Sequence, residues 1–167
     1  MLNSFTAPKS LQNEFFFVNL SNPSNGNVVL DQGNGRINND DVLLLVLEES
    51  GPGFAQAAAV SELFLRDPFT LTIPEFVKRV DRGNRVIFFA NNLLLNPGES
   101  PLGVVVRFID SNNQLFDAPA EDVRLVPNFE FTQVMVKVPD NLAAGTCQIT
   151  VRAHGRVSNM GTIRIAP

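Results

Sequence analysis

The side chains that could do acid–base, nucleophilic or metal chemistry are few and far apart in this chain. There is one histidine, His154, and one cysteine, Cys147. A histidine-based metal cluster needs more than one imidazole, so the single histidine excludes it. His154 precedes Gly155, and this pair predicts a solvated turn at the end of a strand and not a catalytic base.

The surroundings of Cys147 predict a buried thiol. Cys147, Ile149 and Val151 alternate with polar residues, which places the cysteine on the apolar face of a strand. On a continuous strand Cys147 and His154 would point to opposite faces, which disfavours a Cys–His dyad. Neither a Gly-x-Ser-x-Gly elbow nor a glycine-rich phosphate loop occurs. The sequence therefore predicts that the chain is not an enzyme.

Adjacent acidic residues are the remaining candidates for a metal site. They form the pairs Asp40-Asp41, Glu48-Glu49 and Glu121-Asp122. Calcium takes about six to eight oxygen ligands, so one adjacent pair supplies only part of a coordination shell. We expect the two glutamate-containing pairs to be solvated charge.

The composition argues against several classes of partner. The net charge is −4 and no basic run occurs, whereas nucleic acid demands clustered lysine and arginine. The longest unbroken apolar run, residues 42–47, is too short to cross a bilayer, so we expect no membrane insertion. The chain has no tryptophan and no tyrosine, the rings that bring large rigid contact area to a sugar face, which argues against carbohydrate binding.

The second half of the chain predicts an antiparallel β-sandwich. Short apolar strands near residues 85–90, 104–109, 133–138, 147–153 and 161–165 alternate with turns rich in glycine, asparagine and proline, and a short returning strand is expected at 114–117. Period-2 alternation gives the side chains that should face the core. These are Val86, Phe88, Val104, Val106, Phe108, Val134, Val136, Ile149, Val151 and Ile163.

Residues 42–80 are expected to be connecting strands and a linker. The unbroken run 42–47 is typical of a strand buried on both faces. Residues 48–53 indicate a linker, and residues 60–65 an edge strand that ends at Pro68. Residues 73–79, with Pro74 at the start, suit a single helical turn.

Residues 1–41 carry the most specific pattern of the chain. Glu14 to Leu20 is a strand stopped by Ser21-Asn22-Pro23, and a second strand follows within 27–37. The run resembles the last two strands of a Calx-beta domain. The matching residues are Glu14, Phe16, Val18, Leu20 to Pro23, Gly33, Gly35, Ile37 and Asn39-Asp40-Asp41.

The Calx-beta resemblance implies a carboxy-terminal hairpin and a candidate calcium site. Two strands make no sandwich, so this hairpin must borrow a sheet. In calcium-binding members an acidic cluster at the closing end joins carboxylates from earlier loops, which makes Asp40 and Asp41 candidate calcium ligands. The earlier loops have no counterpart in this sequence, and the alternative is a solvated strand end. Calcium is the only cofactor that the sequence suggests.

Residues 81–167 resemble the immunoglobulin-like IPT/TIG domains, and also carboxy-terminal modules of large secreted bacterial proteins. The resemblance departs from those domains in the long loop 91–101, where they have a compact turn. The residues that carry it are Val104 to Phe108, Val138-Pro139, Ala144-Gly145-Thr146, Ile149 to Val151, Gly155, Ser158-Asn159 and Ile163 to Ile165.

These observations favour an all-β, immunoglobulin-like sandwich (residues 81–167) preceded by a Calx-beta-like hairpin (residues 1–41). The expected function is that of a non-catalytic extracellular or cell-surface module for adhesion, structure or protein interaction. The alternative is a self-assembling structural subunit of a filament or virion surface, whose hairpin complements a neighbour's sheet by β-strand pairing. Under either hypothesis the partner is a protein.

Overall fold

The structure is a computed structural model, and it describes residues 14–19, 32–37, 42–48 and 55–167. The chain divides after Asp41 into two compact units, Met1–Asp41 and Val42–Pro167. The described part is nearly all β. None of its helices has the length and hydropathy that a membrane span requires.

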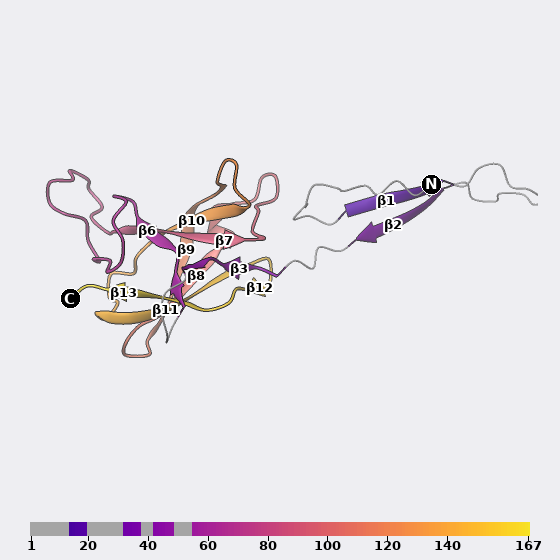
Figure 1. Cartoon of the computed structure of the whole chain (residues 1–167). Helices are drawn as coiled ribbons and strands as arrows, with labels where there is room; N and C mark the ends of the chain where they lie inside the picture. The colour runs from indigo at the N-terminus through magenta and orange to yellow at the C-terminus, as the bar shows by residue number, and fades with distance from the viewer. Residues whose placement is uncertain (1–13, 20–31, 38–41, 49–54) are drawn as a thin grey trace, which may run out of the picture. The chain divides into compact units, whose positions relative to one another are not determined.

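The first unit contains two antiparallel strands, β1 (Glu14–Asn19) and β2 (Gln32–Ile37), drawn in indigo and violet in Figure 1. The register pairs Phe17 with Asn34 and Val18 with Gly33. Among the described residues, each of these strands is hydrogen-bonded along one edge only. The side chains of Phe17 and Val18 are 62% and 50% exposed, and because they are neighbours on a strand they lie on opposite faces of it.

The second unit consists of short and medium strands joined by turns and one short 3₁₀ helix. Its elements are β3 (Leu44–Leu45), β4 (Leu47–Glu48), β5 (Gln56–Ala57), β6 (Ala59–Ser61), β7 (Arg85–Asn91), η1 (Pro101–Gly103), β8 (Val105–Ile109), β9 (Leu115–Leu125), β10 (Phe131–Lys137), β11 (Gly145–Ala153), β12 (Arg156–Val157) and β13 (Gly161–Ile165).

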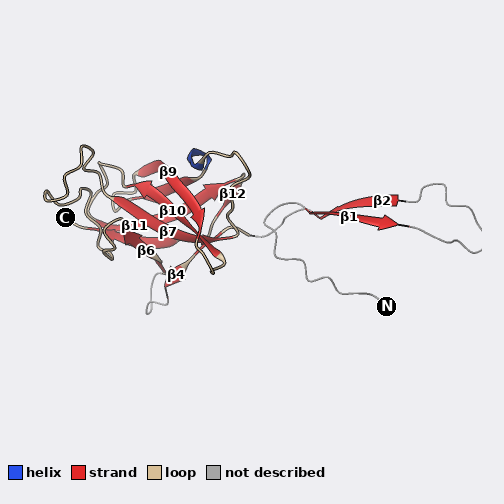
Figure 2. Ribbon diagram, turned by 90° about the horizontal axis from the view of Figure 1, so that it is seen from above, coloured by secondary structure: helices blue, strands red, loops and turns tan. Residues whose placement is uncertain are grey.

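The strands of the second unit form a sandwich that is nearly a closed barrel (Figure 2). The first sheet contains β3 and β6, which both pair with β7, followed by β10 and the second part of β9. The second sheet contains the first part of β9, then β8, β11, β13, β5 and β4, with β12 beside β11. Most of the pairs are antiparallel, and β13 with β5 is parallel.

Two segments join the sheets at opposite sides of the sandwich. Residues 115–119 of β9 pair with β8, whereas residues 120–125 pair with β10. The register shifts between Met135 and Val136, and a bulge of this kind lets a strand bend from one sheet into the other. On the other side, β3 pairs with β7 and β4 pairs with β5, so residues 44–48 pass from the first sheet to the second.

The core lies between the sheets and confirms the predicted inward residues, each of which is at most 1% exposed. Burial alternates residue by residue along β7, β8 and β10, which is the pattern of strands with one face inward. The rings of Phe88 and Phe108 meet edge-to-face across the core with centroids 6.1 Å apart. Cys147 is fully buried, as its alternation predicted.

Three local expectations are corrected by the structure. Residues 42–47 are not buried on both faces: Val42 and Leu44 are 62% and 39% exposed, whereas Leu43 and Leu45 are buried. The reason is that this segment lies along β7 at the side of the sandwich, so only one of its faces meets the core. The short returning strand at 114–117 extends to Leu125 because it serves both sheets. Residues 73–79 form a hydrogen-bonded turn, in which Val77 donates to Pro74, and not a helical turn.

Candidate functional site

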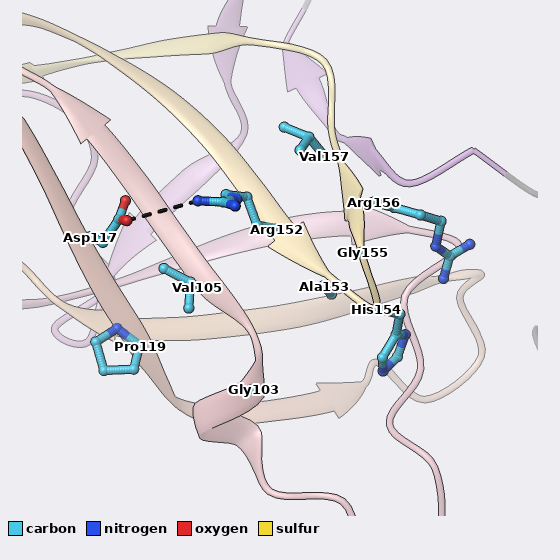
Figure 3. A pocket seen from close by; sticks show the side chains of 10 residues that line it. All are labelled: Gly103, Val105, Asp117, Pro119, Arg152, Ala153, His154, Gly155, Arg156 and Val157. Atoms are coloured by element: carbon cyan, nitrogen blue, oxygen red, sulfur yellow. Dashed lines mark ion pairs between the residues drawn. The ribbon is translucent and has the colours of Figure 1, made fainter.

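A depression of about 380 Å³ lies over the outer face of the second sheet, at the turn between β11 and β12 (Figure 3). Its polar wall comes from β9, β11, the β11–β12 turn and β12, and its apolar wall from β8, β9, β12 and the end of η1. The lining residues are Gly103, Val105, Asp117, Pro119, Arg152, Ala153, His154, Gly155, Arg156 and Val157.

Asp117 is the centre of the charged part of this depression. It faces Arg107 across the β8–β9 pair, and the two side chains form a two-pronged ion pair, Arg107 Nε–Asp117 Oδ1 at 2.7 Å and Nη2–Oδ2 at 2.8 Å. Arg152 of β11 approaches the same carboxylate more loosely, with Nη1 at 3.9 Å from Oδ2. The hydrogen bonds from Arg107 hold the pKa of Asp117 below its ordinary value.

His154 stands at the mouth of the depression in a left-handed conformation, with φ of 52°, as part of the turn that its position before Gly155 predicted. Its Nε2 lies 2.7 Å from Oε1 of Glu99, which comes from the loop before η1. The backbone N–H of Asn96 chiefly lowers the pKa of Glu99, and His154 lowers it further. The pair ties the β11–β12 turn to the loop that ends at η1.

The depression carries charges of both signs, and Arg152 and His154 already contact the carboxylates of Asp117 and Glu99. In Figure 3 Arg152 is turned toward Asp117, whereas Arg156 points away from both. No hydroxyl or thiol side chain is among the lining residues. Cys147 lies in the core, where burial raises the pKa of its thiol to about 12. The depression therefore provides guanidinium and imidazole contacts on a sheet surface.

The residues that the sequence singled out as calcium ligands, Asp40 and Asp41, lie outside the described residues. Within the part of the chain that the structure describes, no three histidine, cysteine, aspartate or glutamate side chains come together to hold a metal ion. Glu48 pairs with Arg66, and Glu121 with Arg85. These glutamates are thus engaged by arginines at the surface.

The outer face of the first sheet is a second candidate, and most of its side chains are apolar. Leu44 is exposed and the other apolar side chains are half-buried, and Asn91 and Gln133 lie among them. Its side chains alternate with the buried ones along β3, β6, β7 and β10, and none belongs to the core cluster or packs against it. We call this surface the apolar face; it consists of Leu44, Val46, Val60, Ile87, Phe89, Phe131 and Met135.

Cross-strand register arranges the apolar face in rows. Val60 pairs with Ile87 and Ile87 with Met135, so these residues cross the sheet side by side. One row is diagonal: the rings of Phe89 and Phe131 lie edge-to-face at 5.4 Å. Phe129, in the β9–β10 turn, is exposed, and its ring centroid lies 5.0 Å from that of Phe131. Aromatic and β-branched pairs of this kind add packing area to a surface.

Sequence reasoning missed both surfaces, although each left a signal. In β7 the residues between the core positions, Ile87 and Phe89, are as apolar as the core residues, which a strand with one solvated face does not need. Arg107 and Asp117 are charges on facing strands, but only the register shows that they are opposite one another.

Comparison of the chain with protein-family models, with curated proteins and with solved structures finds no match.

Proposed function

We propose that the chain is a non-catalytic protein-interaction module of an extracellular or cell-surface protein. The observation that carries this proposal is the apolar face. Its side chains point away from the core, so the fold of the second unit does not require them. Apolar side chains that cluster on an outer face mark an interaction site, because burial of their surface against a partner is favourable.

The fold supports a module of the kind suggested by the sequence. We propose that the second unit is an immunoglobulin-like sandwich of the IPT/TIG type and that the first is a Calx-beta-like hairpin. Antiparallel strands, a core between two sheets and a Gly155 turn before β12 agree with the resemblance. Residues 92–100 form an ordered loop, closed by the Asn96–Glu99 hydrogen bonds and by the 3₁₀ helix that Ser100 caps.

In-cell photo-cross-linking tests the interaction proposal directly. A photoreactive amino acid replaces Gln133, which lies on β10 between Phe131 and Met135 on the same outward side. The matched control replaces Thr150, which occupies a half-buried outward position on β11 of the second sheet. We expect the Gln133 variant to give protein adducts in the cells that make the chain and the Thr150 variant to give few. Equal labelling from both positions would contradict the proposal.

Protease treatment of intact cells tests the location. An extracellular or surface module is degraded while cytosolic markers persist. Survival of the chain under conditions that digest a known surface protein would place it elsewhere.

A self-assembling structural subunit is the second candidate, and the first unit favours it. The described strands β1 and β2 form a sheet of two strands, which is marginally stable alone, and Phe17 and Val18 expose apolar surface on both of its faces. Such a hairpin can complete the sheet of a neighbouring copy through backbone hydrogen bonds.

Amide hydrogen exchange at Phe16, Phe17 and Val18 separates the two candidates. In a subunit assembled through its hairpin, protection of these amides grows with protein concentration. In a module that uses another surface, protection does not depend on concentration. Fast exchange of these amides at every concentration would exclude the hairpin as an assembly element.

A further inference from the structure

We propose that the apolar face docks on the same face of a second copy of this chain, sheet against sheet, to form a two-fold dimer. This inference rests on the proposed function and names the partner of the same surface. Such an interface is isologous: each residue of the patch on one copy meets the patch on the other. Two β-sheets that pack in this way lie about 10 Å apart, with their side chains interdigitated.

The shape of the sandwich directs docking to a face and not to an edge of the second unit. β9 joins the sheets on one side, and residues 44–48 join them on the other. A nearly closed barrel offers little free edge for strand addition. β3 and β6, which lie along the side of β7 that faces away from β10, are only two and three residues long. The extended surface that is left is the apolar face on β7 and β10.

The paired charges around the apolar face favour an uncharged, apolar partner surface, and a second copy of this chain supplies one. Every charged side chain that β7 and β10 present on this side is already ion-paired within the chain. Arg85 binds Glu121, with Nε–Oε2 at 2.8 Å, and Asp81, with Nη2–Oδ2 at 2.6 Å. Lys137 lies 3.3 Å from Asp81.

The charged side chains on the neighbouring part of β9 are also ion-paired within the chain. Its outward charges are Glu121, which Arg85 binds, and Asp122 and Arg124, which pair with each other at 2.6 Å. Gln133 donates to the Asp122 carboxylate at 3.4 Å. Along β7, β10 and this part of β9, a strongly charged partner would find no unpaired counter-charge. An identical face brings apolar rows against apolar rows, and its own paired border places no unpaired like charge opposite another.

The centre of the interface would be aromatic. Phe89 lies in the middle row of the face and forms an edge-to-face pair with Phe131 at the start of β10, and Phe129 extends the pair at the β9–β10 turn. Aromatic side chains near the centre of an interface contribute most of its binding energy, whereas residues at the rim contribute little. Phe89 is therefore the residue whose change should weaken the dimer most.

Sedimentation velocity of the purified full chain over a range of concentrations tests the dimer. We expect the wild-type chain to pass from monomer to dimer as concentration rises. Phe89→Lys should raise the dimer dissociation constant about tenfold or more. The matched control, Thr150→Lys, puts the same charge on the outer face of the second sheet and should leave the constant within about twofold. Circular dichroism and thermal midpoints establish that both variants fold.

Cross-linking locates the contact independently of any loss of folding. Cys147 is fully buried, so a cysteine introduced by Met135→Cys is the reactive thiol in that variant. A bis-maleimide should join two Met135→Cys chains into a covalent dimer and should leave Thr150→Cys chains monomeric. Because Met135→Cys changes one thioether for a thiol at a half-buried position, the fold should survive it.

The outcomes separate this inference from the proposed function. A wild-type chain that stays monomeric at every concentration overturns the dimer. A dimer that persists in Phe89→Lys but dissociates in Phe17→Lys also overturns it, because association then depends on the β1–β2 hairpin. In both cases adducts from the in-cell cross-linker at Gln133 to another protein would still support an interaction module.

Discussion

The two sheets of the second unit are alike on the inside and different on the outside. Both contribute a regular inward row of valine, isoleucine and phenylalanine to the core. Outward, β11 and β13 of the second sheet present only polar side chains, among them Gln148, Thr150 and Arg164, with apolar exceptions on β8 and β9. The same side of β7 and β10 presents the apolar face. In Figure 1, β6, β7 and β10 of the first sheet lie above β11, β12 and β13 of the second.

This difference teaches which apolar residues the fold needs. The second sheet shows that inward alternation with polar outward residues is sufficient for this sandwich, since a sheet facing water on one side needs no more. The outward Ile87, Phe89 and Met135 are therefore additional to folding. Apolar surface that folding does not require is the observation on which the proposed interaction rests.

The largest expected effect is on the free energy of unfolding, when an inward residue of either sheet is truncated. Val136→Ala in the first sheet and Val151→Ala in the second should each lower the free energy of unfolding by about 1–3 kcal/mol, through lost burial and a residual cavity. Urea denaturation measures the change.

The outward partners of those positions are the matched controls. Met135→Ala and Thr150→Ala, measured in dilute monomeric protein, should each cost less than about 1 kcal/mol, as surface substitutions usually do. A Met135→Ala loss as large as that of Val136→Ala would show that the apolar face belongs to the core, and the contrast between the outer faces would fail.

Acid should act on the second sheet's outer face more than on the apolar face. The hydrogen bonds from Arg107 lower the pKa of Asp117 in the folded state, so its stabilising contribution is present above the ordinary aspartate pKa near 3.8. That contribution is lost as the pH falls below this value, through the lower folded pKa. We expect Asp117→Asn to flatten the dependence of the thermal midpoint on pH between about pH 5 and about pH 2.

The rows of the apolar face contain no titratable side chain, so the dimer dissociation constant should change little between about pH 8 and about pH 6, where aspartate and glutamate side chains are ionised. Sedimentation of the wild-type chain at several pH values measures it. A steep loss of association within that range would show that charge, and not apolar contact, holds the copies together.

Calcium should have the smallest effect. If Asp40 and Asp41 belong to a solvated strand end, millimolar calcium should leave the thermal midpoint unchanged. If they are ligands, calcium binds the folded form preferentially and raises the midpoint, and Asp40→Asn with Asp41→Asn abolishes the rise. A rise that those substitutions remove would establish a calcium site in the first unit, distinct from the apolar face of the second.

The sequence by itself determined the fold class and the inward half of the molecule. Val134, Val136, Ile149 and Val151 alternate with polar or flexible residues, and alternation has one physical reading in a sheet with one solvated face. The burial of Cys147 was predicted from the same alternation. In residues 42–47 the rule gave the wrong answer, because six consecutive apolar residues suit both a doubly buried strand and a strand at the side of a sandwich.

Only the tertiary structure decided which outward residues meet. Arg107, Asp117 and Arg152 come from different strands, and their contacts depend on the register of β8 with β9 and β11. Phe89 and Phe131 become neighbours because β7 pairs with β10, although β8 and β9 lie between these strands in the sequence. Periodicity is a local property that fixes the face on which a side chain lies. Pairing between distant strands is non-local, and it decides which side chains share that face.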